Sequence, residues 1–349
     1  MSGDPLKLKA VKRIKRDGTL YCLTRVPNSG RVYFGGSDFS AYTADLNAKE
    51  VEPKTLQRHD SYVNGLAKID NVLLTGGWDR KLIWWDTKAG KVIRLTDNAH
   101  AKWIRDVAAC PDGSCFATVA DDMFLRLWDP KTGKLLKEMR GHEPLTPQHF
   151  PSMLYVCTFS PDGKHIATGD RVGHIVIWDV TTGKAAQTNE SPENYTWDPK
   201  QRRRSIGGVR SLAFSPDGKQ LAVGGVARIN NVDGLGGKAL IHIYDWKTGK
   251  QIHRYAHNKR KGLVEHLAYS HDGKWLLGAG GDKGGFLLFA NPADGKFQAE
   301  HDAKMHVHKF ALDEASETIY AAGHGGLAVW SLAGGTKPPV EARKPDRAK

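Results

Sequence analysis

The pattern that decides the fold is an aromatic residue followed by aspartate at the end of a short apolar run. It occurs at Trp85-Asp86, Trp128-Asp129, Trp178-Asp179 and Tyr244-Asp245, with weaker copies at Phe289-Ala290 and Trp330-Ser331. Successive aromatic positions are 43, 50, 66, 45 and 41 residues apart. Each of the first five copies precedes a turn with glycine, at Gly90, Gly133, Gly183, Gly249 and Gly295. This spacing indicates an internal repeat in which each unit is one supersecondary structure.

A second turn pattern lies upstream of the aromatic residue in four of the units. It occurs as Cys110-Pro-Asp-Gly113, Ser160-Pro-Asp-Gly163, Ser215-Pro-Asp-Gly218 and Ser270-His-Asp-Gly273. Asp-Gly and Thr-Gly between short apolar runs predict β-hairpins. Four strands in every roughly 40–45 residues are typical of one blade of a β-propeller. The sequence therefore predicts an all-β repeat protein.

On these motifs the chain resembles the WD-repeat family across nearly its whole length. The family's Gly-His element appears at Gly141-His142, with relaxed forms at Arg58-His59, Ala99-His100 and Ala256-His257. The resemblance implies a seven-bladed β-propeller with four antiparallel strands in each blade. It also implies a structural hydrogen-bonding set in blades 2 and 3: His59, Thr75, Asp79 and Trp85, then His100, Thr118, Asp122 and Trp128. Blade 4 has His142, Thr168 and Trp178 but carries Val172 where the aspartate belongs.

The domain organisation follows from the units at the two ends of the chain. We expect residues 1–335 to form a single propeller whose last unit lacks its outer strand. Residues 6–15 alternate weakly between apolar and polar, and we expect them to complete blade 7 and close the ring. Closure in this way removes an exposed sheet edge. Residues 336–349, with two prolines and mixed charge, are expected to be a disordered tail.

The composition favours a basic protein that does not span a membrane. Lys and Arg number 51 against 38 Asp and Glu, a net charge of +13, which favours anionic partners. No apolar run approaches the roughly 18 residues of a membrane span, and the N-terminus has no secretory signal. We expect a cytoplasmic location. Cys110 and Cys115 flank a turn and could be bridged under oxidation, but a free buried thiol is the commoner state.

Three segments are much longer than the other connections: residues 143–153, 189–208 and 226–238. The resemblance places all three on the top face, above blades 4 and 5. Long loops in a compact domain are usually functional or disordered. Basic and aromatic residues lie in or beside them: Tyr195, Trp197, Arg202, Arg203, Arg204, Arg228, Lys259, Arg260 and Lys261. This basic loop patch suits phosphate contact with base stacking, or an acidic protein surface, or it is simply solvated charge.

The resemblance also marks positions on the inner strands where top faces of such propellers often hold partners. Carried onto this sequence, they are Tyr21, Tyr62, Asn64, Trp78, Trp103, Arg105, Tyr155, Arg171, Arg210, Glu265 and His308. Trp, Tyr and Arg are the residue types that dominate binding hot spots. Trp78 and Trp103 are not needed by the blade pattern, and their alternative role is packing between blades 2 and 3.

A weaker constellation lies in blade 7. His306 and His308 project to one face of a strand, with Glu265 on the neighbouring inner strand and His324 in a turn. Two histidines and a carboxylate can ligate a transition metal. In a chain with 15 histidines, a His-x-His pair also arises by chance, so the interpretation without a metal is favoured.

No motif for catalysis, phosphate binding or a zinc site occurs in the sequence. We therefore predict a non-catalytic scaffold without a cofactor. Its top face would hold an acidic peptide or protein, and the chain would be a monomer within a larger complex. The alternative is a nucleic-acid-associated (RNA) propeller that uses the basic loops of blades 4–6. A small-ligand or metal-binding propeller centred on blade 7 is the third hypothesis.

Overall fold

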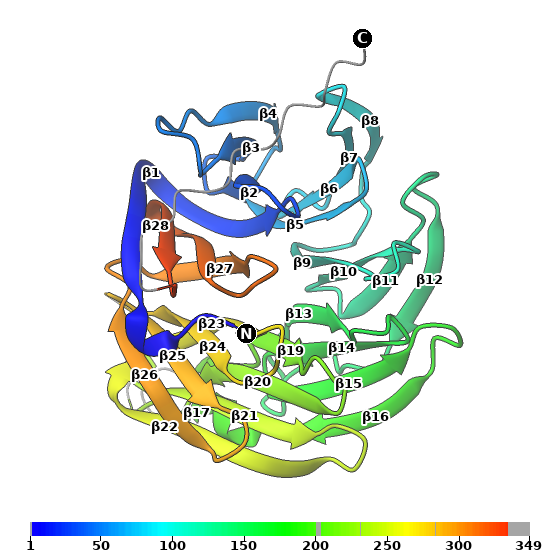
Figure 1. Ribbon diagram of the computed structural model, residues 1–349. Coiled ribbons are helices and arrows are strands. Elements are labelled where there is room, and N and C mark those ends of the chain that lie inside the picture. Colours follow the sequence, from blue (N-terminus) through cyan, green and yellow to red (C-terminus); the bar gives the residue numbers. More distant parts are fainter. Residues whose placement is uncertain (1, 200–203, 231, 283, 334–349) are drawn as a thin grey trace.

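A computed structural model describes residues 2–199, 204–230, 232–282 and 284–333. Apart from two short 3-10 turns, Pro5–Lys7 and Pro192–Asn194, every regular element in this part of the chain is a strand. The strands form sheets that follow one another in chain order around a common centre (Figure 1). The fold is an all-β propeller. None of its described helical segments is long and apolar enough to cross a membrane.

Five sheets have four antiparallel strands each, paired in sequence order. The first contains β5 (Val63–Ile69), β6 (Val72–Gly77), β7 (Leu82–Asp86) and β8 (Lys91–Thr96). The next contains β9 (Ile104–Ala109), β10 (Phe116–Ala120), β11 (Phe124–Trp128) and β12 (Leu135–Arg140). The third contains β13 (Leu154–Phe159), β14 (His165–Asp170), β15 (His174–Asp179) and β16 (Ala185–Glu190). The last two contain β19 (Ser211–Phe214), β20 (Gln220–Val226), β21 (Lys238–Asp245) and β22 (Lys250–Lys261), then β23 (Leu263–Tyr269), β24 (Leu276–Gly281), β25 (Gly285–Asn291) and β26 (Lys296–Asp302).

The expectation of seven separate blades is wrong, because the structure has six large sheets. The sixth has six strands in the order β27-β28-β1-β2-β3-β4. Its members are β27 (Val307–Leu312), β28 (Thr318–Ser331), β1 (Lys9–Arg25), β2 (Arg31–Gly36), β3 (Ser40–Asp45) and β4 (Lys54–Arg58). β1 runs for 17 residues without a break and pairs with β28 through its first half and with β2 through its second half. The residues expected to form the first and last units are therefore joined in one sheet.

The predicted Asp-Gly turns have the expected backbone. Gly113 has a φ of +75°, and its N–H donates to the carbonyl oxygen of Cys110 at 2.9 Å. A positive φ is unfavourable for residues with a side chain, which explains the glycine. All four cysteines, including Cys110 and Cys115 beside this turn, are free and buried.

The core lies between neighbouring sheets. Between the β5–β8 and β9–β12 sheets, Trp84 and Trp128 approach edge to face, with ring centroids 6.2 Å apart. Leu74, Ile104 and Phe116 are fully buried in the same cluster. Each sheet therefore depends on its neighbours to cover its apolar face, as in other repeat architectures.

The segment 189–208 is not only a loop. Residues Tyr195–Asp198 (β17) and Arg204–Gly207 (β18) pair as a two-stranded hairpin. Lys259, Arg260 and Lys261, expected in a loop, are instead the last residues of β22. The three long segments do come together: the Tyr195 hydroxyl donates to Gln148 at 2.5 Å, and the backbone N–H of Ile229 donates to Thr196.

Candidate partner-binding site

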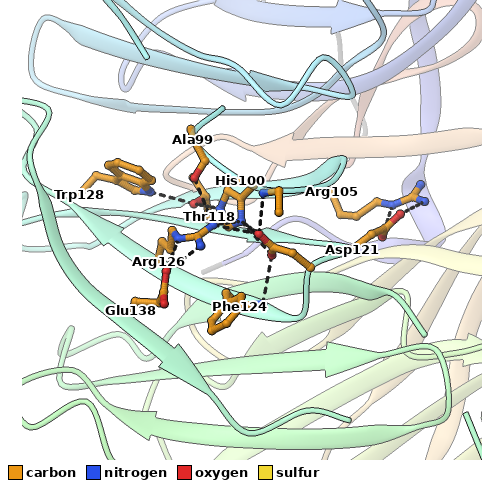
Figure 2. A network of polar contacts seen from close by, with 11 residues as sticks. Ala99, His100, Arg105, Thr118, Asp121, Phe124, Arg126, Trp128 and Glu138 are labelled. Carbon is orange, nitrogen blue, oxygen red and sulfur yellow. Dashed lines mark hydrogen bonds and ion pairs between the residues drawn. The ribbon is translucent and has the colours of Figure 1, made fainter. Parts of the chain in front are cut away.

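Buried polar sets hold the inner strands of the sheets in place. In the β9–β12 sheet, His100 Nε2 is 2.7 Å from Thr118 Oγ1, and His100 Nδ1 is 3.0 Å from a carboxylate oxygen of Asp122. The indole N–H of Trp128 donates to the same Thr118 oxygen at 2.8 Å (Figure 2). The β5–β8 sheet repeats this arrangement with His59, Thr75, Asp79 and Trp85. The histidines and threonines are buried, the side chains of Asp79 and Asp122 are 4% and 5% exposed, and the hydrogen bonds satisfy these groups.

The carboxylate in each set is strongly stabilised. Burial alone would raise the pKa of Asp122. This effect is outweighed by hydrogen bonding and charge attraction from His100, by a hydrogen bond from the backbone N–H of Ala101 and by the charge of Arg126. The pKa of Asp122 is therefore well below its usual range. Arg126 also pairs with Glu138 at 2.6 Å, so the network reaches the surface of the sheet (Figure 2).

The β13–β16 sheet also has a complete set, which the repeat pattern in the sequence did not predict. His142 Nδ1 is 2.9 Å from Asp170 Oδ2, His142 Nε2 is 2.8 Å from Thr168 Oγ1, and Trp178 donates to the same threonine. Asp170 is the last residue of β14 and lies two positions before Val172, where the pattern has its aspartate. In the sequence, this aspartate follows the threonine of its set by two residues, whereas in the other two sets the aspartate follows the threonine by four.

A central cavity of about 500 Å³ opens among the inner strands. Eight of the eleven positions proposed from the sequence line it: Tyr21, Asn64, Trp78, Arg105, Tyr155, Arg210, Glu265 and His308. In the same order, these residues lie in β1, in β5, in the turn that follows β6, in β9, in β13, directly before β19, in β23 and in β27. Tyr62, Trp103 and Arg171 do not line the cavity.

Aromatic rings and two arginines form a continuous surface at one side of this cavity. We call it the aromatic–arginine surface, and it consists of Tyr21, Tyr62, Trp78, Trp103, Arg105, Tyr155 and Arg210. Trp78 and Trp103 stack with ring centroids 4.4 Å apart and planes within 1°. Tyr62 contacts Trp78 at 4.8 Å and Tyr21 at 5.7 Å. Trp103 is 45% exposed, a large value for an aromatic ring in a folded protein.

Arg105 is held rigidly at the centre of this surface. Its guanidinium makes two hydrogen bonds of 2.7 Å with the Asp121 carboxylate (Figure 2). It also lies 4.9 Å from the Trp78 ring centroid and 5.3 Å from that of Trp103. Bidentate pairing with a carboxylate and contact with aromatic faces both fix the orientation of a guanidinium. Asn64 donates to the carbonyl oxygen of Arg105 at 2.6 Å, so its role is to support this residue.

Arg210 differs from Arg105 because no carboxylate forms a salt bridge with it among the described residues, although its charge acts on Glu265 and lowers the pKa of that carboxyl. Its guanidinium carbon is 3.9 Å from the Tyr155 ring centroid. Its Nε is buried and has no hydrogen-bond partner in the described part of the chain, and the same holds for the indole Nε1 of Trp78. Buried donors are expected to have acceptors. Two donors beside the cavity are therefore left unsatisfied by the described residues.

Arg171 has a structural role. It donates to the Ser205 hydroxyl at 3.1 Å and to the Ser205 carbonyl oxygen at 3.0 Å, which ties the β17–β18 hairpin to the β13–β16 sheet. Deeper in the cavity, sequence reasoning missed an ion pair between Lys309 and Asp106, with Nζ and Oδ1 3.4 Å apart. The available signal was an aspartate in one inner strand and a lysine in another.

The basic loop patch is partly neutralised. Arg204 pairs with Asp233 at 2.9 Å and donates to a backbone carbonyl, and Arg260 pairs with Asp302 and lies 3.8 Å from Glu300. Trp197 packs against Phe150, with ring centroids 5.2 Å apart. Arg228, Lys259 and Lys261 are exposed. Arg202 and Arg203 lie outside the described residues.

Repeated antiparallel sheets braced by buried His–Thr–Asp–Trp sets define the class of protein, a β-propeller built from sequence repeats. The WD40 family model, described as "WD domain, G-beta repeat", matches residues 51–86, 91–129, 133–179 and 201–228. These four segments of the chain are therefore WD repeats.

Curated relatives match parts of the chain at low identity. Nuclear distribution protein nudF of Aspergillus niger is 27% identical over 201 residues, which are 53% of this chain and 42% of that protein. Eukaryotic translation initiation factor 3 subunit I of Bombyx mori is 28% identical over 183 residues, 50% of this chain and 52% of the relative. Telomerase protein component 1 of Mus musculus is 25% identical over 256 residues, 73% of this chain and 8% of the relative. The chain spans about half or less of these relatives' lengths.

Proposed function

We propose that the protein is a non-catalytic interaction scaffold that holds an acidic peptide or protein segment on the aromatic–arginine surface. The observation that carries the proposal is the set of donors and rings at the cavity rim: exposed Trp103 stacked on Trp78, and Arg210 with no carboxylate partner among the described residues. The relatives include a subunit of a translation initiation factor by name, which agrees with a role in assemblies.

The chemistry of the surface favours an acidic segment with an apolar or aromatic side chain. Arg105 is already neutralised by Asp121, so its main contribution is a flat, rigid platform beside the two indoles. Arg210 lines the cavity and supplies the cation that a carboxylate can approach. Rigid aromatic anchors next to arginine lose little conformational entropy on binding, which makes them effective contact residues.

The test is affinity purification of the full chain from its native cells, compared with a Trp103→Ala variant. A central tryptophan in an interface typically contributes about 2 kcal/mol or more, which corresponds to roughly 30-fold in affinity. We expect partners to be lost from Trp103→Ala and from Arg210→Ala. Leu136→Ala is the matched control, because Leu136 is 50% exposed on the outer strand β12 and its truncation leaves the surface intact. Equal recovery of partners by Trp103→Ala and Leu136→Ala would contradict the proposal.

A parallel purification with nuclease treatment distinguishes this function from nucleic-acid binding. Ion pairs already engage Arg204 and Arg260, so the basic loop patch supports a polyanion less well than the sequence suggested. If the partners depend on RNA or DNA, they should disappear after nuclease treatment and at raised salt. Partners that survive both treatments support the protein scaffold.

We also propose that the N-terminal strand closes the propeller. Residues 9–15 of β1 pair with residues 326–331 of β28, and β1 then continues into its pairing with β2. A strand shared in this way leaves β28 without a free edge along these residues, and unpaired edges are sites of aggregation. The proposed tail, residues 336–349, lies outside the described residues.

A further inference from the structure

Three histidines gather at the rim of the cavity, beside the aromatic–arginine surface. The rings of His306 and His308 stack with centroids 4.6 Å apart, and His324 lies 4.8 Å from the first and 4.9 Å from the second. One ring nitrogen from each histidine lies within 4.8 Å of the others. The cluster therefore converges on a single small volume.

The backbone fixes the three side chains relative to one another. His308 is the second residue of β27 and His306 directly precedes that strand, so the two side chains, two residues apart, project to the same side. The backbone N–H of His324 donates to the carbonyl oxygen of His306 at 2.9 Å. A Cβ on Gly323 would lie 2.0 Å from that same oxygen, so glycine is required for β28 to approach this closely. The convergence is built into the sheet and does not depend on loop conformation.

The cluster holds nitrogen atoms whose hydrogen-bonding capacity is unused. His306 Nε2 and His308 Nε2 are buried, and neither forms a hydrogen bond with another described residue. The nearest carboxylate oxygen, of Glu265, is 3.5 Å from His306 Nε2. Buried polar atoms without partners require an explanation such as an ion or water.

We propose that His306, His308, His324 and Glu265 bind one divalent transition-metal ion, with zinc as the best fit. Three imidazoles and a carboxylate are ligands that Zn²⁺ accepts in a tetrahedral site. Ligand atoms around such an ion are about 3.4 Å apart, given metal–nitrogen bonds of about 2.1 Å. The ring nitrogens would therefore move together by about an ångström, which small side-chain rotations provide.

The charges near the cluster are compatible with a cation. Among the described residues, Glu265 places a carboxylate oxygen 3.5 Å from His306 Nε2, where its charge can offset that of a cation. The positive charge of Arg210 disfavours binding of a cation nearby, but its guanidinium is engaged by the face of the Tyr155 ring. None of the four proposed ligands belongs to the aromatic–arginine surface, although the two sites adjoin: the rings of His308 and Tyr21 lie 5.3 Å apart.

The experiment uses the full chain purified without a polyhistidine tag and stripped of metal by a chelator. Zn²⁺ is titrated in competition with a chromogenic chelator, and Co²⁺ is added as a spectroscopic probe. We expect one ion per chain and the visible absorption of tetrahedral Co²⁺. Single variants His306→Gln, His308→Gln and His324→Gln should each weaken the affinity at least about tenfold, whereas His149→Gln, which alters an exposed histidine outside the cluster, should not.

Stability measurements keep the test valid if a variant folds poorly. Bound metal should raise the unfolding temperature of the wild type and of His149→Gln, but not that of the triple His→Gln variant. Glu265→Gln keeps all three imidazoles and should bind Co²⁺ more weakly with an altered spectrum. The proposal is overturned if the stripped wild type takes up no stoichiometric ion, or if the triple variant binds Zn²⁺ as tightly as the wild type.

Discussion

At the scale of single residues, Asp170 is the sharpest case for a test, because its position breaks the repeat pattern while its contacts preserve it. It is 1% exposed and accepts a hydrogen bond from His142 at 2.9 Å. Replacing it with alanine leaves the imidazole of His142 buried with one nitrogen unpaired. Breaking such a buried pair costs about 3 kcal/mol. We expect Asp170→Ala to lower the free energy of unfolding by this amount, measured by urea denaturation.

The matched control is Val172→Ala, at the position where the repeat pattern places the aspartate. Val172 is half-buried, and its contact with Asp170 is made by the backbone N–H, which alanine retains. Its truncation should cost about 1 kcal/mol or less. If the two variants were equally destabilised, the assignment of Asp170 to the polar set would be wrong.

Residue types predicted the members of the polar sets, but not every position. The complete sets at His59 and His100 could be proposed from spacing alone because all four residues keep the family spacing. Asp170 was missed because a carboxylate at either of two positions, the last residue of the strand or two residues later, can reach the same imidazole. Arg171 was predicted to bind a partner, and the sequence did not indicate that it also ties down the neighbouring hairpin, because the fold of that segment could not be predicted.

At the scale of elements, the N-terminal segment is the one on which most of the structure depends. Leu8 packs against the cluster around β27 and β28, and Ile14 against the cluster around β2 and β28. The indole N–H of Trp275 donates to the carbonyl oxygen of Gly3 at 3.0 Å. Deletion of residues 1–15 removes a strand from a sheet and uncovers two core clusters. We expect the unfolding temperature to fall by at least about 10 °C, which calorimetry would measure.

A peptide of residues 2–18 added in trans distinguishes loss of this strand from general damage. If the strand acts by pairing with β28, the peptide should restore much of the lost stability in a concentration-dependent way. A scrambled peptide of the same composition is the control. An unchanged unfolding temperature after deletion would contradict both the pairing and the proposed closure.

The sequence predicted that this strand joins the last unit, but not that it continues into the first. The pattern of residues 6–15 indicates a strand, and the turn signal Asp17-Gly18 indicates a break. In the structure Gly18 has a φ of +83°, yet β1 continues through it. The β17–β18 hairpin was missed for a similar reason, since its strands have four residues each and no alternating apolar pattern.

At the scale of the whole molecule, the polar sets couple the stability of several sheets to pH. His100 and His142 are almost completely buried, and burial is the main reason that the pKa of each is lowered. The titratable groups that face them are Asp122, Arg126 and Glu138 around His100, and Asp170, His174 and Glu190 around His142. Attraction to the carboxylates raises each pKa but does not reverse the effect of burial. Both rings are therefore neutral in the folded protein near pH 7.

The direction of the pH effect follows from where each state binds protons. A histidine in the unfolded chain takes up a proton below about pH 6.5, whereas these two resist protonation while the protein is folded. Their contribution to stability is present above pH 6.5 and is lost as the pH falls through the lowered folded-state pKa. Each histidine then costs about 1.4 kcal/mol per pH unit. The lowered pKa of Asp122 extends the loss to lower pH, since that carboxylate must also be protonated.

We therefore expect the free energy of unfolding to fall as the pH drops below about 6.5, with each of these two histidines contributing up to about 1.4 kcal/mol per pH unit, measured by urea denaturation at fixed ionic strength. A His100→Gln, His142→Gln double variant should start from a lower stability at pH 7 and show a flatter pH dependence in this window. His149→Gln, an exposed position, should keep the wild-type slope. Because the two histidines lie in adjacent sheets that share a core, their protonation acts on one cooperative unit. If the double variant kept the full slope, the acid sensitivity would have to arise from groups outside these sets.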